Sequence, residues 1–204
     1  MNKIIFNERC GLQQAVLERW KTMTRRILKC PKKFRGVEDV ELEFHKRPGQ
    51  DFYYDCVVVD ADGHELGQLP LPYEVGDVVA IAQRYSELAQ TDDYYDCDQA
   101  KRQKGWDNKM FVKAHLMLHH IRITDLWFER LQDISDKDCM KEGITKGDFK
   151  DFPQQMYFPY KGCKDTEVMW TPQGAFHILI DKISGTGTWD ENPWVVAYTF
   201  ELVD

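Results

Sequence analysis

A short basic segment near the start of the chain holds the residue types best suited to binding an anion. Lys21, Arg25 and Arg26 lie within six residues of one another and are interleaved with the hydroxyls of Thr22 and Thr24. Ammonium and guanidinium groups form strong, charge-assisted hydrogen bonds with phosphate and carboxylate oxygens. The segment therefore predicts a strand that grips an anion such as phosphate, and the alternative is a solvated basic face that binds nothing.

The distribution of charge points to the same part of the chain. The net charge of the 204 residues is −7, but residues 1–36 hold ten Lys or Arg against two Glu, so this segment carries +8 and the remainder −15. An anionic ligand would find its attraction concentrated in these first residues. A protein that grips a long duplex is expected to neutralise many phosphates, so the acidic remainder favours a small or locally docked ligand.

Histidine and cysteine offer weaker candidates for chemistry. His45, His115, His119 and His120 are possible zinc ligands, but adjacent histidines on a strand face opposite sides and no cysteine or carboxylate stands at ligand spacing. The six cysteines lie at least 20 residues apart, without a Cys-x-x-Cys pair. We therefore expect no metal and no cofactor, and we expect reduced, mostly buried thiols.

The composition is that of a soluble, folded protein. Hydrophobic residues make up 43% of the chain and charged residues 30%, which excludes disordered and low-complexity classes. No apolar run approaches the roughly 18 residues of a membrane span, and residues 1–9 lack the apolar run of a signal peptide. The sequence predicts one domain over residues 1–204, in the cytoplasm and without a membrane partner.

Strands and helices that would position the basic segment follow one another irregularly. Hydrophobic patterns predict strands at 4–6, 40–44, 53–59, 78–82, 110–117, 121–131 and 194–202, and an extended segment at 21–27. Helices are predicted at 12–20, from a capping box at Ser135 to Gly143, and from an N-cap at Thr171 to Gly185. Because strands do not alternate regularly with helices, the pattern favours an α+β fold built on a small mixed or antiparallel barrel.

Two stretches break the pattern and are predicted as irregular insertions, at 84–108 and 145–170. The first is polar and contains aromatic residues beside or within it: Tyr85, Tyr94, Tyr95 and Trp106. Aromatic rings in such a loop are candidates for stacking on bases, and the alternative is that they pack the loop against the body.

Five motifs occur in an order that is specific to a known family. They are WKTMTRR at 20–26, PYEVGD at 72–77, ERLQDI at 129–134, KEGI at 141–144 and NPWVV at 192–196. Together they resemble the ASCH family, and more closely the ASCH-like proteins encoded by phages and prophages. The resemblance covers most of the chain apart from the two insertions.

The resemblance implies a PUA-like β-barrel with flanking helices, whose relatives bind RNA, nucleotides or modified nucleosides in a cleft beside the barrel. Some bacterial ASCH proteins are amidohydrolases that cleave the acetyl amide of N4-acetylcytidine. Their lysine, threonine and glutamate fall on Lys21, Thr24 and Glu142, so the resemblance implies these as catalytic residues. Arg25 and Arg26 are then expected to bind the ligand.

Amide cleavage places a geometric demand on Lys21 and Thr24. A threonine hydroxyl needs a base to take its proton, and the developing oxyanion needs a donor. Residues three apart on an extended segment point to opposite faces, so the chain must bend for the two side chains to converge. A desolvated Lys21 could act as the base, whereas pairing with Glu142 would keep it charged and make it a donor.

The chain departs from close phage relatives in one strand. Those relatives carry Trp-x-Arg-Glu after the Gly-Asp turn, whereas this chain has AIAQ at 80–83. The amide of Gln83 can read a base edge but cannot serve as a general base, so we expect Gln83, with Tyr85, to bind the ligand. Three functions stay open: ligand binding, hydrolysis of an N-acylated nucleoside, and a phage accessory role through protein contacts.

Overall fold

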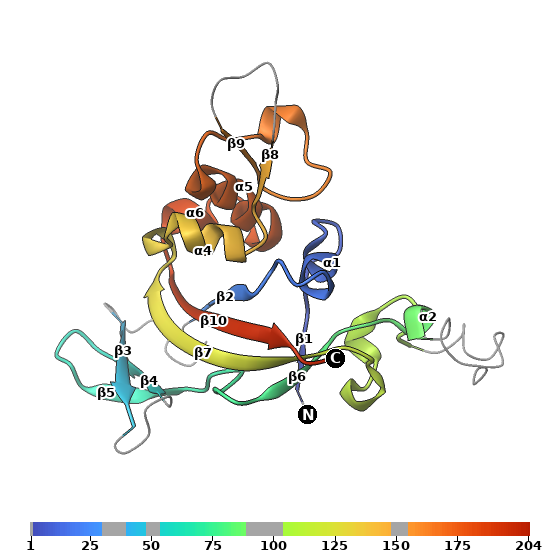
Figure 1. Ribbon diagram of the computed structural model, residues 1–204. Helices are drawn as coiled ribbons and strands as arrows, with labels where there is room; N and C mark the ends of the chain where they lie inside the picture. Colours follow the sequence, from blue (N-terminus) through green and yellow to red (C-terminus); the bar gives the residue numbers. More distant parts are fainter. Residues whose placement is uncertain (1, 30–39, 48–53, 89–103, 148–154) are drawn as a thin grey trace.

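A computed structural model of the protein describes residues 2–29, 40–47, 54–88, 104–147 and 155–204 (Figure 1). The fold is α+β, as the sequence predicts. Its strands are β1 (Lys3–Ile4), β2 (Met23–Ile27), β3 (Glu41–Lys46), β4 (Tyr54–Val59), β5 (Glu65–Leu69), β6 (Val78–Ile81), β7 (His120–Arg130), β8 (Thr145–Gly147), β9 (Met156–Phe158) and β10 (Trp194–Leu202). Its α-helices are α1 (Leu12–Leu17), α2 (Tyr85–Leu88), α4 (Asp136–Lys141), α5 (Pro172–Ser184) and α6 (Thr188–Glu191).

A five-stranded sheet in the order β1-β6-β7-β10-β2 forms the centre of the molecule. β1 runs parallel to β6, and the other neighbours are antiparallel. The long β7 and β10 pair along most of their length and curve together (Figure 1). The described pairings leave the sheet open, with β1 and β2 at its two edges. Two smaller sheets, β3-β4-β5 and β8-β9, complete the described strands.

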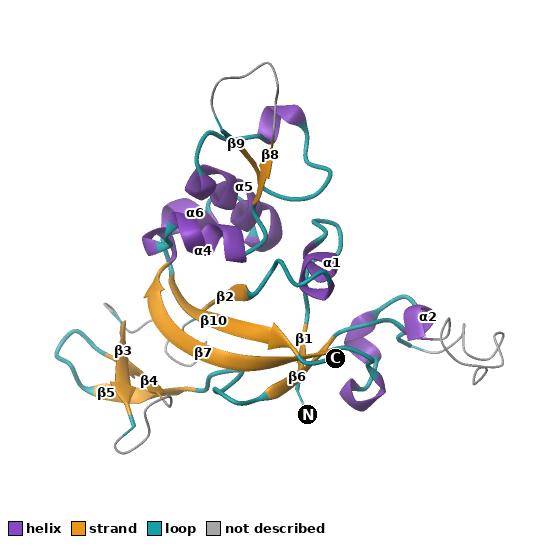
Figure 2. Cartoon of the chain, viewed as in Figure 1, coloured by secondary structure: helices purple, strands orange, loops and turns teal. Residues whose placement is uncertain are grey.

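Helices cover the concave side of the curved sheet. Figure 2 shows α4, α5 and α6 gathered over the β7–β10 pair. The predicted caps are confirmed, since Ser135 Oγ accepts from Asp138 N at 3.1 Å and Thr171 Oγ1 accepts from Gly174 N at 3.1 Å. The apolar face of α5, including the buried Phe176, joins sheet residues in one large core. Burial of this face holds the helix against the sheet.

The predicted strand at 110–117 is wrong. These residues form two short 3₁₀ turns, η2 (Lys109–Phe111) and η3 (Ala114–Leu116). Asn108 caps the first turn by accepting from Met110 N. Lys3 Nζ donates hydrogen bonds to three backbone carbonyls, those of Lys109, Met110 and Val112, at 3.2, 2.6 and 3.0 Å. The carbonyls of the consecutive residues Lys109 and Met110 thus face the same cation, whereas consecutive carbonyls of a strand point to opposite sides.

The two predicted insertions are partly described. Within the first, Tyr85–Leu88 forms α2, while residues 89–103, with Tyr94 and Tyr95, lie outside the described residues. The second contains more structure than the sequence predicts, because β8 and β9 pair there and η5 (Asp165–Glu167) follows. None of the helices in the described part of the chain is both long and apolar enough to cross a membrane.

Alkaline pH is expected to destabilise this core through its buried thiols. Burial raises the pKa of Cys139 from 9.0 to about 12 and that of Cys56 from 9.0 to about 11. The unfolded chain releases these protons near pH 9 while the folded chain keeps them. The stability that each thiol contributes is therefore full below pH 9 and is lost as pH rises toward the folded-state pKa.

Urea unfolding of the wild type and Cys139→Ala at about pH 8 and about pH 10 measures this loss. We expect the difference in unfolding free energy between the two proteins to shrink by about 1.4 kcal/mol over this range, because the variant has no thiol at position 139 to ionise. A difference that does not change with pH would contradict the prediction.

Candidate active site

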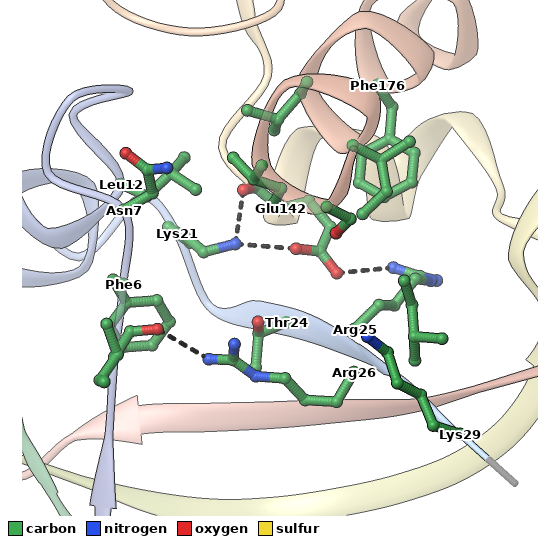
Figure 3. A pocket seen from close by; sticks show the side chains of 16 residues that line it. Phe6, Asn7, Leu12, Lys21, Thr24, Arg25, Arg26, Lys29, Glu142 and Phe176 are labelled. Carbon is green, nitrogen blue, oxygen red and sulfur yellow. Dashed lines mark hydrogen bonds and ion pairs between the residues drawn. The ribbon is translucent and has the colours of Figure 1, made fainter. Parts of the chain in front are cut away.

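A pocket of about 500 Å³ lies where β2, α5 and the chain after β1 meet (Figure 3). One wall is polar and comes mainly from β2 and its flanks. The opposite wall is apolar and comes mainly from α5. The lining residues are Ile5, Phe6, Asn7, Leu12, Lys21, Thr24, Arg25, Arg26, Ile27, Lys29, Glu142, Phe176, Leu179, Ile180, Ile183 and Ser184. The pocket therefore brings together five residues that the sequence singles out, namely Lys21, Thr24, Arg25, Arg26 and Glu142.

Lys21 reaches this pocket because the chain bends before β2 begins. The backbone N–H groups of Trp20 and Lys21 both donate to Ala15 O, which wraps the segment around the end of α1. β2 starts only at Met23, so Lys21 precedes the strand. The chain thus makes the bend that is needed for Lys21 and Thr24 to converge, and the side chains of both residues line one cavity.

The ammonium of Lys21 is buried and held by three acceptors. Its side chain is 2% exposed. Nζ donates to Glu142 Oε2 at 2.8 Å, to Glu142 O at 2.6 Å and to Met23 O at 2.8 Å. Burial lowers the pKa of Lys21, the carboxylate of Glu142 opposes this, and the guanidiniums of Arg26 and Arg25 lower the pKa further. With three acceptors around Nζ, the resting side chain is a donor rather than a base.

Glu142 stands between two cations. It follows the last turn of α4, and its side chain is 5% exposed. Oε2 pairs with Lys21, and Oε1 accepts from Arg25 Nη1 at 3.0 Å. Arg25 is held in turn by Glu129 of β7, with Nε 2.7 Å from Glu129 Oε1. A carboxylate at the negative end of a helix is unfavourable by itself, and these two partners offset that cost.

Thr24 presents a free hydroxyl to the pocket. The residue is 5% exposed, and Oγ1 makes no hydrogen bond to any residue that the structure describes. Figure 3 shows this oxygen pointing into the space beneath Lys21 and Glu142. Because this oxygen faces the cavity and makes no bond to the described protein, it is available to a ligand.

One backbone edge of β2 also borders the pocket. Thr22 O and Leu28 N both bond to β10. By the alternation of an antiparallel ladder, Arg25 and Ile27 turn their N–H and C=O groups to the opposite edge. No strand in the described part of the chain pairs with that edge, so it offers a donor and an acceptor side by side.

Arg26 and Lys29 bring further positive charge to the same cavity. Arg26 Nη2 donates to Ile5 O at 3.0 Å, and its guanidinium lies 5.9 Å from the centroid of the Phe6 ring. Lys29 is exposed, follows the end of β2 and extends toward the pocket (Figure 3). The cavity wall thus carries four cations and one carboxylate.

Gln83 and Tyr85, which the sequence also predicts as ligand-binding residues, do not line this pocket. Gln83 is 6% exposed and its Oε1 accepts from Leu118 N at 2.8 Å, so it fastens the segment before β7. Tyr85 packs against a small second core around Ala80 and Val112. Both side chains support the region after β6.

The sequence does not mark the apolar wall of the pocket, nor Glu129, the partner of Arg25. Phe176 and Ile183 look like ordinary core residues of an amphipathic helix, and only their position in space places them at the cavity. Glu129 falls in a strand pattern without any mark of its role. A signal for it exists in the buried Arg25, because a guanidinium excluded from water requires an acidic partner.

The histidines considered as zinc ligands lie in separate places. His45 Nε2 lies 3.0 Å from Glu43 Oε2, whereas His119 Nδ1 and His120 Nδ1 lie 4.0 and 2.6 Å from the carboxylate of Asp204. Within the described ranges, the one group of three side chains close enough to share an ion is the Asp60, Asp62 and His64 turn, which lies outside the pocket.

Comparison with protein-family models, with curated proteins and with solved structures finds no match to this chain.

The buried network is expected to contribute strongly to stability. Glu142→Gln leaves the ammonium of Lys21 in the interior without a counter-charge, so we expect a loss of about 3–5 kcal/mol in unfolding free energy. Lys21→Met combined with Glu142→Gln should cost less than the two single changes added together, by about 1–3 kcal/mol. Urea unfolding of the four proteins gives this coupling, and strictly additive losses would contradict the network.

Proposed function

We propose that the pocket binds a nucleotide or modified nucleoside, free or at an accessible position of an RNA. The observation that carries this proposal is the pairing of an apolar wall from α5 with the polar edge of β2 across one cavity of about 500 Å³. Small-ligand pockets are commonly of this size, mostly apolar, and fitted with a few convergent polar groups.

The chemistry of the two walls suits a nucleobase. A flat ring can lie along the apolar side of the cavity, where Ile183 of α5 is exposed, because every base has an apolar face. The N–H and C=O groups at the β2 edge complement a base edge that carries both a donor and an acceptor. The hydroxyl of Thr24 adds a third polar contact.

The proposal includes the PUA-like architecture that the ASCH resemblance implies. The curved sheet supports it, because its two edge strands approach one another across the pocket. Arg26 on β2 donates to Ile5 O, one residue beyond β1. On this interpretation the pocket occupies the seam at which a barrel of this type would close.

A thermal-shift screen tests ligand binding. We expect a nucleoside or nucleotide at about 100 times its Kd to stabilise the wild type by about 2.7 kcal/mol and to raise Tm by about 5 °C or more. The shift should vanish in Arg26→Ala and persist in Arg122→Ala, a matched change on an exposed face of β7. If no nucleoside, nucleotide or short RNA moves Tm, binding is excluded and a role through protein contacts is favoured.

The free hydroxyl of Thr24 favours a second candidate function, hydrolysis of an N-acylated nucleoside such as N4-acetylcytidine. Thr24 Oγ would attack the acyl carbon, and its proton would pass to the base nitrogen as the amine leaves. Water would then attack the acyl-threonine ester, which releases the acyl group as a carboxylate and a proton and restores the hydroxyl. Lys21 would stabilise the oxyanion as a donor. Because its three protons already have acceptors, the substrate oxygen must displace one of them.

Turnover is measured by incubating the protein with N4-acetylcytidine and following the loss of the acetyl mass. We expect Thr24→Ala to lower the rate by about 100-fold or more and Thr24→Ser to retain part of it, because serine keeps a hydroxyl nucleophile. Thr124→Val, on an exposed face of β7, serves as the matched control. Absence of turnover in the wild type, or a rate unchanged in Thr24→Ala, excludes the hydrolase.

A further inference from the structure

The pocket holds more positive charge than its own acidic groups neutralise. Lys21 and Arg25 are engaged by Glu142, and Arg25 also by Glu129. Arg26 and Lys29 form no ion pair with any acidic side chain among the residues that the structure describes. Within the described part of the chain, two cations of the cavity wall are therefore left without a counter-charge.

Among the described residues, one nitrogen of the Arg26 guanidinium also lacks a hydrogen-bond acceptor. Its Nε is buried and has no hydrogen-bond partner among the described residues, although Nη2 donates to Ile5 O. A backbone carbonyl is neutral and does not balance a guanidinium. A buried donor without an acceptor is costly, so an acceptor that enters the pocket at this point would be bound favourably.

The negative charge of the rest of the chain makes the positive pocket selective for small anions. Outside residues 1–36 the chain carries −15, so the cavity is a local attraction for anions in an acidic protein. Such a charge pattern draws in a small anion and opposes a long polyanion that must lie across the remaining surface. The cavity also has the volume of a small-ligand site.

We propose that the ligand is anionic and enters the pocket as a nucleoside phosphate, with its phosphate bound by Arg26 and Lys29. The nucleoside part of this inference rests on the proposed function, and the phosphate part rests on the two unpaired cations. Figure 3 shows both cations below the Lys21–Glu142 pair, with the guanidinium of Arg26 beside Thr24 and the ammonium of Lys29 nearer to Arg25. A phosphate there leaves the upper part of the cavity to the base.

Isothermal titration tests the proposal with three probes at low salt: N4-acetylcytidine, its 5′-monophosphate and inorganic phosphate. We expect the monophosphate to bind at least about tenfold more tightly than the nucleoside, the effect of one charge-assisted hydrogen bond. Lys29→Gln and Arg26→Gln should each remove most of that gain. Lys137→Gln, the same change on the exposed face of α4, should leave it intact. The gain should also shrink as salt is raised.

The outcomes separate the phosphate inference from the proposed function. Equal affinity for nucleoside and monophosphate overturns the inference while leaving nucleoside binding in place. Binding of inorganic phosphate that Lys29→Gln abolishes, without binding of either nucleoside compound, supports the anion site and overturns the proposed function. A short RNA that binds more tightly than the monophosphate contradicts the preference for a small ligand. No binding of any probe overturns both.

Discussion

The buried ion pair between Lys21 and Glu142 is the interaction on which the rest of the site depends. It joins the turn before β2 to the end of α4, and Arg25 extends it to Glu129 on β7. Removing such charges from water is costly, and the cost is recovered only when every partner is in place. The network therefore fixes three elements relative to one another and leaves the hydroxyl of Thr24 at a defined place.

The same network divides the cations of the pocket into two kinds. Lys21 and Arg25 have their charge balanced by Glu142 and Glu129, whereas Arg26 and Lys29 pair with no carboxylate of the described residues. The balanced cations hold the framework together. The other two are the ones to which the proposed phosphate contact is assigned. This division also separates residues whose main role is in stability from those to which the proposal assigns ligand binding.

Most of the fold that the sequence predicts correctly follows from local signals. The capping residues Ser135 and Thr171 mark helix starts through hydrogen bonds to nearby backbone, which depend only on adjacent residues. The prediction of a strand at 110–117 is wrong because the ammonium of Lys3, more than 100 positions away, determines how the carbonyls of this segment point. The prediction that Gln83 faces a ligand rests on the chemistry of its amide and on its place in the segment that the phage relatives fill with Trp-x-Arg-Glu. The Gln83 amide instead meets the backbone of Leu118, a partner that only the folded chain reveals.

The separation of Lys21 and Glu142 along the chain has a consequence for how the molecule assembles. The two residues lie 121 positions apart, and a contact of that kind forms only after a long loop has closed. A chain emerging from the ribosome thus has its basic segment long before the carboxylate that neutralises it. During synthesis these early cations are therefore exposed, and the cavity that they line is completed only when α5, from the second half of the chain, packs over them.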